Sequence, residues 1–379
     1  MMAKDEFGPN YVVEVHNPSL GIEGFLVIDN TALGPGKGGI RMTADVTVEE
    51  IRRLARAMTW KNALAGIPFG GAKSGLVWNP PQGSSADIRA RKKETVEWFA
   101  RSLAPFIPKY YIAGPDVNTG AEEMRWFAEA SGKWNAATGK PSDFCTKSPS
   151  GKKKCGLPHE LGSTGFGVAH ATAVAANLRG IDLKKATVAI EGYGNVGSFA
   201  HQFLQEMGAK IVAVADRGGG VYHEEGLDVK SLRFLKSQGR SVYEYPHGKK
   251  LSHDDLLILG VDILIPASVT DVIKEGHKNK IQAKIIVEGA NIPMRENVEE
   301  SLWKRGIVVV PDIIANAGGV ISSYAEYRGF YASKMLALVE RTIKKTVREV
   351  MEKSLKERRN PREVAFQIAR ERIMRASTS

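Results

Sequence analysis

The chain has 379 residues, of which 43% are hydrophobic and 25% are charged, proportions typical of a globular protein with more than one domain. No apolar run approaches the roughly 20 residues that a membrane-spanning helix requires, and the first residues lack the basic and then apolar pattern of a signal peptide. These features argue against a membrane protein and predict a cytoplasmic one.

The net charge of +11 raises the question of nucleic-acid binding. Between residues 333 and 375, however, basic residues are interleaved with glutamates, which is typical of solvated helices with ion pairs. The sequence has no zinc-finger spacing, no aromatic RNA-binding signature and no low-complexity basic tail. We therefore predict that nucleic acid is not a partner and that the positive charge attracts anionic small molecules.

In chain order, the first third combines strands with helices. The hydrophobic patterns predict strands at 11–15 and 24–28 and helices at 47–65 and 86–103. Asp45 or Thr47 can cap the first of these helices. This part of the chain is therefore predicted to form a mixed α/β domain.

The two cysteines of the chain, Cys145 and Cys155, lie in a stretch rich in lysine, serine and proline between residues 140 and 158. The prolines and glycines of this stretch predict a loop. Two free thiols are the first expectation for a cytoplasmic protein, and a local disulfide is the alternative. A metal site with His159 as a further ligand is disfavoured because no second cysteine pair completes the usual four ligands, so we predict no metal.

After this loop, strands and helices alternate, with strands predicted at 187–191, 210–215, 263–266, 284–288 and 307–310. Such alternation predicts a parallel sheet with helices on both faces. The predicted fold class is α/β with two domains, an α/β substrate and oligomerisation domain and a Rossmann-type, doubly wound dinucleotide-binding domain. We expect the first to span residues 1–157 and the second residues 158–332, with helices in 333–379 returning to complete the first.

A dinucleotide-binding fingerprint follows the first strand of the second domain. The strand at 187–191 runs directly into a G-x-G-x-x-G motif, and a helix is predicted over residues 198–207. In this motif the first glycine makes a tight turn, the second lets the backbone approach a pyrophosphate, and the third lets the helix pack closely. The predicted cofactor-binding residues of the turn are Gly192, Gly194, Asn195, Val196 and Gly197.

The next predicted strand leads to Asp216, 24 positions after Gly192 (216 − 192). An acid at this place normally accepts hydrogen bonds from the ribose hydroxyls, which favours NAD. Arg217 beside it could instead pair with the 2′-phosphate of NADP. The sequence therefore predicts NAD or NADP as the cofactor and leaves the choice open.

Three lysines of the first domain have unusual surroundings. Lys37 and Lys73 lie in glycine-rich stretches that we expect to be loops, where small neighbours would let a substrate come close. Lys61 falls on the apolar face of the helix at 47–65, where a lysine is costly to bury unless an anion meets it. Burial beside other cations would also lower the pKa of Lys73 and allow proton exchange near neutrality.

Two of these lysines, and the candidate acid Asp116, also have a structural interpretation that involves no substrate. Lys73 could be solvated, and Lys61 could extend its amine toward the end of its helix. Asp116, which follows a strand predicted at 110–113, could be a turn or capping residue. The residue types alone therefore leave their functions open.

Long motifs of the chain resemble the glutamate dehydrogenases of the Glu/Leu/Phe/Val dehydrogenase superfamily. The resemblance covers nearly the whole chain in the order found in that family. It is carried by the segments 34–75, 114–119, 288–291 and 311–320.

The resemblance implies roles for the residues of the substrate site. Lys61 would bind the substrate α-carboxylate, and Lys73 would be the catalytic lysine that polarises the carbonyl and manages the attacking or leaving water. Asp116 would carry a proton to and from the amino nitrogen. Lys37 and Ser323 match positions that hold the side-chain carboxylate in glutamate enzymes. Relatives acting on leucine, valine or phenylalanine have an apolar residue at the Lys37 position, so this lysine would reject leucine as well as bind glutamate.

The resemblance also implies roles in the cofactor site. Thr164 matches a threonine near the nicotinamide amide, and Asn291 and Asn316 match residues that line the ribose and nicotinamide. The chain departs from the family at Leu161-Gly162-Ser163, where an arginine-containing segment is usual, and the cysteine-containing loop before it resembles an insertion.

The implied activity is the reversible oxidative deamination of L-glutamate to 2-oxoglutarate and ammonium, with hydride transfer to NAD(P)⁺ in a cleft between the domains. The alternatives are a dehydrogenase of leucine, valine or phenylalanine, and a non-catalytic regulatory paralogue. The family resemblance further implies a homo-oligomer, specifically a hexamer.

Overall fold

The computed structural model describes residues 5–147 and 151–378 of the chain. The chain divides into two compact units. Unit 1 consists of Met1–Leu161, Val320–Met335 and Ala369–Ser379, and unit 2 consists of Gly162–Gly319 and Leu336–Ile368. Within the described residues, no helix is both long enough and apolar enough to cross a membrane.

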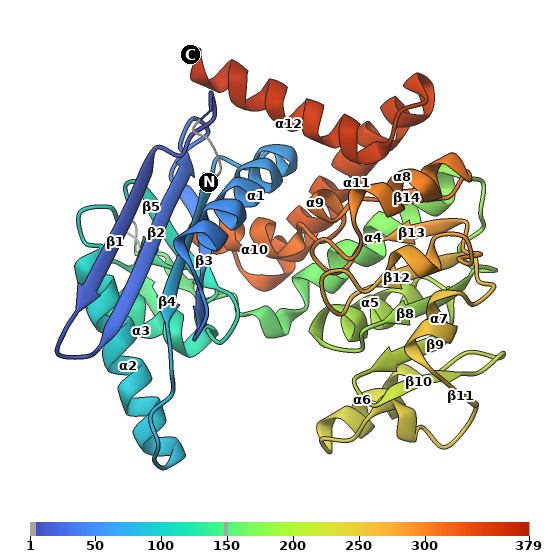
Figure 1. Ribbon diagram of the computed structural model, residues 1–379, viewed down its shortest axis with the longest axis horizontal. Coiled ribbons are helices and arrows are strands. Elements are labelled where there is room, and N and C mark those ends of the chain that lie inside the picture. The colour runs from blue at the N-terminus through green and yellow to red at the C-terminus, as the bar shows by residue number, and fades with distance from the viewer. Residues whose placement is uncertain (1–4, 148–150, 379) are drawn as a thin grey trace. The chain divides into compact units, whose positions relative to one another are not determined.

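A five-stranded sheet with strand order β1-β2-β4-β3-β5 forms the centre of unit 1 (Figure 1). Its strands are β1 (Tyr11–Asn17), β2 (Ile22–Asn30), β3 (Gly36–Thr43), β4 (Gly70–Val77) and β5 (Tyr111–Pro115). β3 pairs in parallel with both β4 and β5, while β2 pairs antiparallel with β1 and β4. Three neighbouring strands therefore run in the same direction.

Helices cover both faces of this sheet, namely α1 (Val48–Ala65), α2 (Ser85–Ser102) and α3 (Ala121–Ser131). On β2, Phe25 and Val27 pack with Ile51 of α1, whereas the alternate residues Leu26 and Ile28 belong to the core formed with α2 and α3. Successive side chains of a strand point to opposite faces, so β2 is buried on both sides.

The predicted helix at 47–65 is confirmed as α1 with its cap. The Thr47 hydroxyl accepts a hydrogen bond from the Glu50 amide, and the helix ends at Gly66, whose φ of 63° suits glycine. The strands predicted at 11–15 and 24–28 are confirmed within β1 and β2.

Lys37 and Lys73 lie within β3 and β4, so the expectation of loops at these positions is wrong. Their glycine neighbours serve close packing of the sheet rather than a loop. A Cβ atom at Gly71 would lie 2.0 Å from Oγ1 of Thr59 on α1, which no larger residue could tolerate. Glycine-rich sequence can therefore mark a strand that another element approaches closely.

A seven-stranded sheet with strand order β11-β10-β9-β8-β12-β13-β14 forms the centre of unit 2 (Figure 1). Its strands are β8 (Thr187–Glu191), β9 (Lys210–Asp216), β10 (Gly219–Tyr222), β11 (Lys249–Leu251), β12 (Ile263–Pro266), β13 (Ile285–Val287) and β14 (Val308–Val310). The strands in the order β9-β8-β12-β13-β14 are parallel, which confirms the predicted Rossmann-type sheet. β10 and β11 add an antiparallel edge that the sequence analysis did not predict.

The strand order of this sheet reverses between β8 and β12. In such sheets ligands bind at the reversal, beyond the carboxyl ends of the strands. The helices of unit 2 that accompany the sheet are α4 (Ser163–Leu178), α5 (Asn195–Glu206), α6 (Val229–Ser237), α7 (His253–Leu257), α8 (Glu296–Lys304) and α9 (Asp312–Ala315). Short 3₁₀ helices are η1 (Trp134–Ala136) and η2 (His159–Leu161) in unit 1, and η3 (Val242–Glu244) and η4 (Glu275–His277) in unit 2.

The last three helices are divided between the units differently from the expectation. They are α10 (Gly318–Tyr327), α11 (Ala332–Glu357) and α12 (Pro361–Ser377). Residues 336–368 belong to unit 2, although the sequence analysis assigned them to the first domain. Ile343 lies on a buried stripe of α11, and a Cβ atom at Gly167 of α4 would lie 3.5 Å from its Cγ1 atom. α11 therefore buries its apolar side within unit 2.

α10 belongs mainly to unit 1, although the sequence analysis assigned residues up to 332 to the nucleotide domain. The ring of Phe69, directly before β4, makes edge contacts with Tyr324 and Tyr327 of α10 at centroid distances of 5.8 and 5.4 Å. Aromatic packing of this kind stabilises α10 beside the start of β4.

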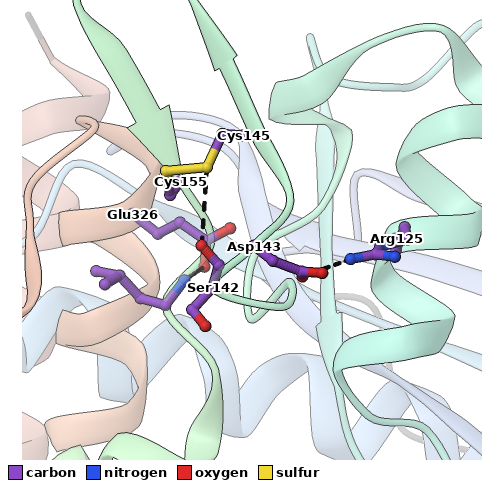
Figure 2. The surroundings of a disulfide bond; sticks show 7 residues. Arg125, Ser142, Asp143, Cys145, Cys155 and Glu326 are labelled. Carbon is purple, nitrogen blue, oxygen red and sulfur yellow. Dashed lines mark hydrogen bonds and ion pairs between the residues drawn. A yellow bond between two sulfur atoms is a disulfide. The ribbon is translucent and has the colours of Figure 1, made fainter.

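Cys145 and Cys155 form a disulfide, so the expectation of two free thiols is wrong (Figure 2). They face each other in the hairpin of β6 (Cys145–Lys147) and β7 (Lys153–Cys155), with their Cα atoms 4.0 Å apart. The pairing of two short strands, where a loop was expected, brings the sulfurs within bonding distance, so the alternative of a local disulfide is confirmed. Residues 148–150 of the predicted loop lie outside the described residues.

Candidate active site

The parallel strands of unit 1 bring together residues that are distant in sequence. β4 carries Lys73, and Asp116 directly follows β5. The Nζ atom of Lys73 lies 3.1 Å from Oδ1 of Asp116, and only 7% of the Lys73 side chain is exposed. Lys37, on β3 between these strands, is 3% exposed. The structure thus gathers three of the predicted site residues in one buried cluster.

Arg41 also belongs to this cluster, although the sequence analysis did not single it out. Its Nε donates a hydrogen bond of 2.9 Å to Oδ2 of Asp116, and its terminal nitrogen lies 2.5 Å from Oε1 of Glu50. Arg41 follows Lys37 by four positions on β3, a spacing that puts both side chains on the same face of a strand. That spacing is the signal that could have identified it.

Burial and mutual repulsion change the pKa values of the cluster. Burial, with the charge of Lys73, lowers the pKa of Lys37 to about 7. Burial also lowers the pKa of Lys73, although Asp116 opposes the shift. Burial would raise the pKa of Asp116, but the charges of Lys73 and Arg41 outweigh it and hold this carboxyl below its usual value. The Lys73–Asp116 pair can therefore exchange a proton with a bound molecule more readily than an isolated lysine.

The ammonium of Lys37 has no ion-pair or hydrogen-bond partner in the part of the chain that the structure describes. A Cβ atom at Gly114 would lie 2.3 Å from its Nζ atom, so the ammonium lies directly against the backbone of β5. A buried cation without a partner is costly, and an anionic ligand would relieve that cost.

A second buried ion pair, between Lys140 and Glu326 of α10, lies in the same unit. The Nζ of Lys140 is 2.5 Å from Oε1 of Glu326, and both side chains are 0% exposed. Oε2 of Glu326 accepts hydrogen bonds from the amides of Gly139 and Leu157, at 2.7 and 2.8 Å. Glu326 therefore connects the two ends of the segment 139–157, which contains the disulfide hairpin. Figure 2 shows Glu326 close to this disulfide.

Other predicted substrate residues also fall in unit 1. Ser323 is partly exposed on α10, one turn before Glu326. Lys61 is partly buried on α1. His159 of η2, weighed above only as a metal ligand, is exposed and lies near enough to Lys37 and Asp116 for their charges to affect it. No group of acidic, histidine or cysteine side chains within the described residues is placed to hold a metal ion.

In unit 2, the fingerprint turn has the geometry that a dinucleotide requires. Gly192 has a φ of +103°, and a Cβ atom there would lie 2.4 Å from the amide nitrogen of Ser268. A Cβ at Gly197 would lie 2.0 Å from the carbonyl oxygen of Gly192, whereas one at Gly194 would meet nothing within 4 Å. The first and third glycines thus serve the turn and the helix packing, and the second leaves the backbone open.

The helix α5 begins at Asn195 directly after this open glycine, and no side chain caps its first turn. Its unpaired amide groups and dipole favour a phosphate there. A cavity of about 420 Å³ lies against the turn, and it is lined by Tyr193, Gly194, Asn195, Ser198, Arg233, Lys236 and Ser237. The residues present therefore fit a dinucleotide.

Asn291 and Asn316, predicted to line the nicotinamide side, come together at the carboxyl ends of β13 and β14. Nδ2 of Asn316 donates a hydrogen bond of 3.0 Å to Oδ1 of Asn291. Thr164 lies in the first turn of α4, and a Cβ atom at Gly318 would lie 3.1 Å from its Cα atom. Thr164 and the segment that follows Asn316 are thus close neighbours in unit 2.

A buried guanidinium, which the sequence analysis missed, supports both asparagine segments. Arg362 forms ion pairs with Glu288, Glu299 and Asp312, and its Nη1 atom lies 2.8 Å from Oδ1 of Asp312. Glu288 begins the segment that leads to Asn291, and Asp312 begins the segment that leads to Asn316. Burial raises the pKa of Glu288 to about 8. Since Arg362 is far from these carboxylates in sequence, no local pattern could have revealed the cluster.

A Rossmann-type unit with an open fingerprint turn, and a second unit with a buried Lys–Asp pair, define a dinucleotide-dependent dehydrogenase. Residues 156–379 match the family model described as Glutamate/Leucine/Phenylalanine/Valine dehydrogenase, and residues 9–133 match the model of the dimerisation domain of the same enzymes. The chain belongs to this family of amino-acid dehydrogenases.

Individual relatives agree with this assignment. The chain is 41% identical over 366 residues to a glutamate dehydrogenase of Aeropyrum pernix, with 92% of this chain and 84% of the relative covered. It is 38% identical over 367 residues to one of Thermotoga maritima, with 93% and 85% covered. A solved hetero-hexameric glutamate dehydrogenase of Thermus thermophilus, in a leucine-bound form, superposes with a TM-score of 0.83 at 27% identity and covers 97% of this chain and 89% of its own.

Proposed function

We propose that this chain is a glutamate dehydrogenase that converts L-glutamate, NAD(P)⁺ and water to 2-oxoglutarate, ammonium, NAD(P)H and a proton. The observation that carries the proposal is the buried ammonium of Lys37, which has no partner within the described residues. A substrate with a side-chain carboxylate would neutralise it, whereas an apolar side chain would leave it unpaired. Relatives of 38–41% identity named as glutamate dehydrogenases support the same substrate.

The Lys73–Asp116 pair would carry the proton transfers. The lowered pKa of Lys73 lets its amine accept a proton from the attacking water and, as an ammonium, polarise the carbonyl oxygen. The ionised carboxylate of Asp116, oriented by Arg41, would take a proton from the substrate amino group. Lys61 would bind the α-carboxylate, and Ser323 would assist Lys37.

The nucleotide, when bound, supplies the hydride acceptor at its nicotinamide ring. The turn from Gly192 to Gly197 would bind its diphosphate, with the side chains of Asn195 and Val196 beside it. Thr164, Asn291 and Asn316 would line the nicotinamide end. Asp216 and Arg217 would lie at the adenosine ribose.

An oligomer is part of the proposal, since the Thermus thermophilus relative is described as hetero-hexameric and the matched dimerisation-domain model covers residues 9–133. That its subunits are identical stays a prediction. Glutamate, 2-oxoglutarate and ammonium are its small-molecule partners. A homo-hexamer and a cytoplasmic location stay predictions.

The proposal is tested by steady-state assays that cross glutamate, leucine, valine and phenylalanine with NAD⁺ and NADP⁺. We expect glutamate to have the highest kcat/KM with at least one cofactor, and a Lys37→Leu variant to lose glutamate oxidation by about 100-fold or more. Thr43→Val, a change at the far end of β3, is the matched control. A wild-type preference for leucine, or an unchanged Lys37→Leu variant, would contradict the proposal.

A further inference from the structure

The carboxylate of Asp216, at the end of β9, is fully occupied by the protein itself. Its Oδ1 accepts hydrogen bonds from the amide of Gly218 at 3.0 Å and from the hydroxyl of Ser241 at 2.5 Å. Its Oδ2 accepts from Nζ of Lys236 at 2.6 Å and from the amide of Val242 at 3.0 Å. A carboxylate has about four lone-pair positions, so these four donors saturate it.

This saturation changes what Asp216 can do for a nucleotide. A ribose 2′-hydroxyl selects NAD by donating a hydrogen bond to a free carboxylate at this place. Here that hydroxyl would have to displace one of the existing donors. The Asp216 side chain is only 10% exposed, so water does not replace a lost donor freely. Asp216 therefore acts as the anchor of the loop around Ser241 and of Lys236 rather than as a ribose acceptor.

Lys236 is the group of this cluster that remains open to a ligand. Its side chain is 38% exposed, and within the described residues it makes no hydrogen bond other than that to Asp216. An ammonium has three donors, so two are available. Lys236 also lines the cavity at the fingerprint turn, together with Gly194 and Asn195. The ammonium is thus held in place by Asp216 and faces the same cavity as the diphosphate site.

The other charges around this point favour an anion. Arg217 follows Asp216 directly and is exposed. The acid Glu244 lies close enough to Asp216 for their charges to interact, and it is paired with Arg240, whose Nε lies 2.9 Å from Oε2. The carboxylate of Asp216 is matched by Lys236, which leaves Arg217 as excess positive charge. A phosphate at this position would complete the charge balance.

We propose that Lys236 is a specificity-determining residue that binds the 2′-phosphate of NADP, and that this chain therefore prefers NADP to NAD. The inference rests on the proposed function, because it concerns the cofactor of the same reaction. Arg217, exposed directly after Asp216, adds the second positive charge of the phosphate site. Asp216, which in many related sheets favours NAD, here orients the lysine that favours NADP.

The experiment measures nucleotide binding directly, so that it does not depend on which amino acid the enzyme oxidises. Isothermal titration calorimetry with 2′,5′-ADP and with 5′-AMP compares ligands that differ in the 2′-phosphate alone. We expect the wild-type protein to bind 2′,5′-ADP about tenfold or more tightly than 5′-AMP, since the 2′-phosphate adds a charge-assisted hydrogen bond with Lys236.

Lys236→Met should remove this difference while 5′-AMP affinity stays within about twofold, and Lys236→Arg should retain it. The matched control is Lys230→Met on the same helix, α6, which makes the same change in charge at an exposed position outside the cavity. Equal wild-type affinity for the two ligands, or a Lys236→Met variant that behaves like Lys230→Met, would overturn the proposal. If 2′,5′-ADP binds more tightly than 5′-AMP through Lys236 but glutamate is not oxidised, the proposed reaction is wrong and this inference stands.

Discussion

Unit 1 and unit 2 each contain a cluster of charged side chains, and the two clusters have opposite excess charge. In unit 1 the cations Lys37, Arg41, Lys73 and Lys140 face the carboxylates of Glu50, Asp116 and Glu326. In unit 2 one cation of the described residues, Arg362, faces the carboxylates of Glu288, Glu299 and Asp312. One cluster has a cation left over, and the other has two carboxylates left over (3 − 1).

The two clusters relieve their excess charge in different ways. In unit 2 burial raises the pKa of Glu288 to about 8 and also raises the pKa of Glu299, so bound protons reduce the excess negative charge. In unit 1 the excess cation is Lys37, whose pKa of about 7 keeps it partly charged. We therefore interpret Lys37, which has no partner within the described residues, as part of a binding site and the acids around Arg362 as a structural cluster.

The largest effect is expected at the pair that would perform the chemistry. Lys73→Met removes the ammonium but keeps the length of the side chain, and we expect kcat to fall about 10³-fold, within the range for loss of an acid–base group. Binding of 2′,5′-ADP should stay within about twofold of wild type. Lys93→Met, which breaks an ion pair with Glu97 on the exposed side of α2, is the control. Turnover above a tenth of wild type would contradict the assignment of Lys73.

The structural role of the unit 2 cluster predicts a loss of stability instead. Arg362→Met leaves the buried carboxyl groups of Glu288, Glu299 and Asp312 without their cation, and we expect the free energy of unfolding to fall by about 3 kcal/mol or more. Urea denaturation measures this free energy of unfolding. The control is Arg370→Met, which breaks an exposed ion pair with Glu6 and should cost less than about 1 kcal/mol.

The same variant tests the proton uptake by Glu288. A folded-state pKa of about 8, above the usual value, means that the folded protein binds the proton more tightly and loses stability as the pH rises toward 8. Between the ordinary pKa of a glutamate, 4.5, and about 8, the loss of stability caused by Arg362→Met should therefore be smaller at the lower pH than at the higher pH. Equal losses throughout would contradict a protonated Glu288 in the cluster.

The smallest effect concerns the charge of Lys37 itself. Deprotonation of Lys37 above its pKa of about 7 removes the cation that would bind a side-chain carboxylate. Glutarate is a dicarboxylate without a reacting amino group. Its inhibition constant should therefore increase about tenfold per pH unit above this value. In Lys37→Met the inhibition should be weak and should lack this pH dependence. A wild-type constant that does not change with pH would show that Lys37 does not carry the binding.

Local sequence was sufficient for much of the fold. The helix α1 with its Thr47 cap and the strands β8 and β9 follow from hydrophobic period and capping residues, which act over a few positions. The fingerprint turn also follows from sequence, because each glycine answers a local steric demand. The glycine-rich sequence around Lys37 and Lys73 indicates site residues, even though both lysines lie in strands and not in loops.

Tertiary structure alone decided the electrostatics. Arg41 meets Asp116, Glu326 meets Lys140, and Arg362 meets Glu288, and the members of these pairs are 74 to 186 positions apart in the chain. The occupied carboxylate of Asp216 and the disulfide of the β6–β7 hairpin also depend on which backbone segments pair. Burial and partnership set the pKa of a side chain, and both are created when distant segments pack together. The sequence by itself determined which residues could bind a dinucleotide and an acidic amino acid, and the tertiary structure decided which of their charges were left for a ligand.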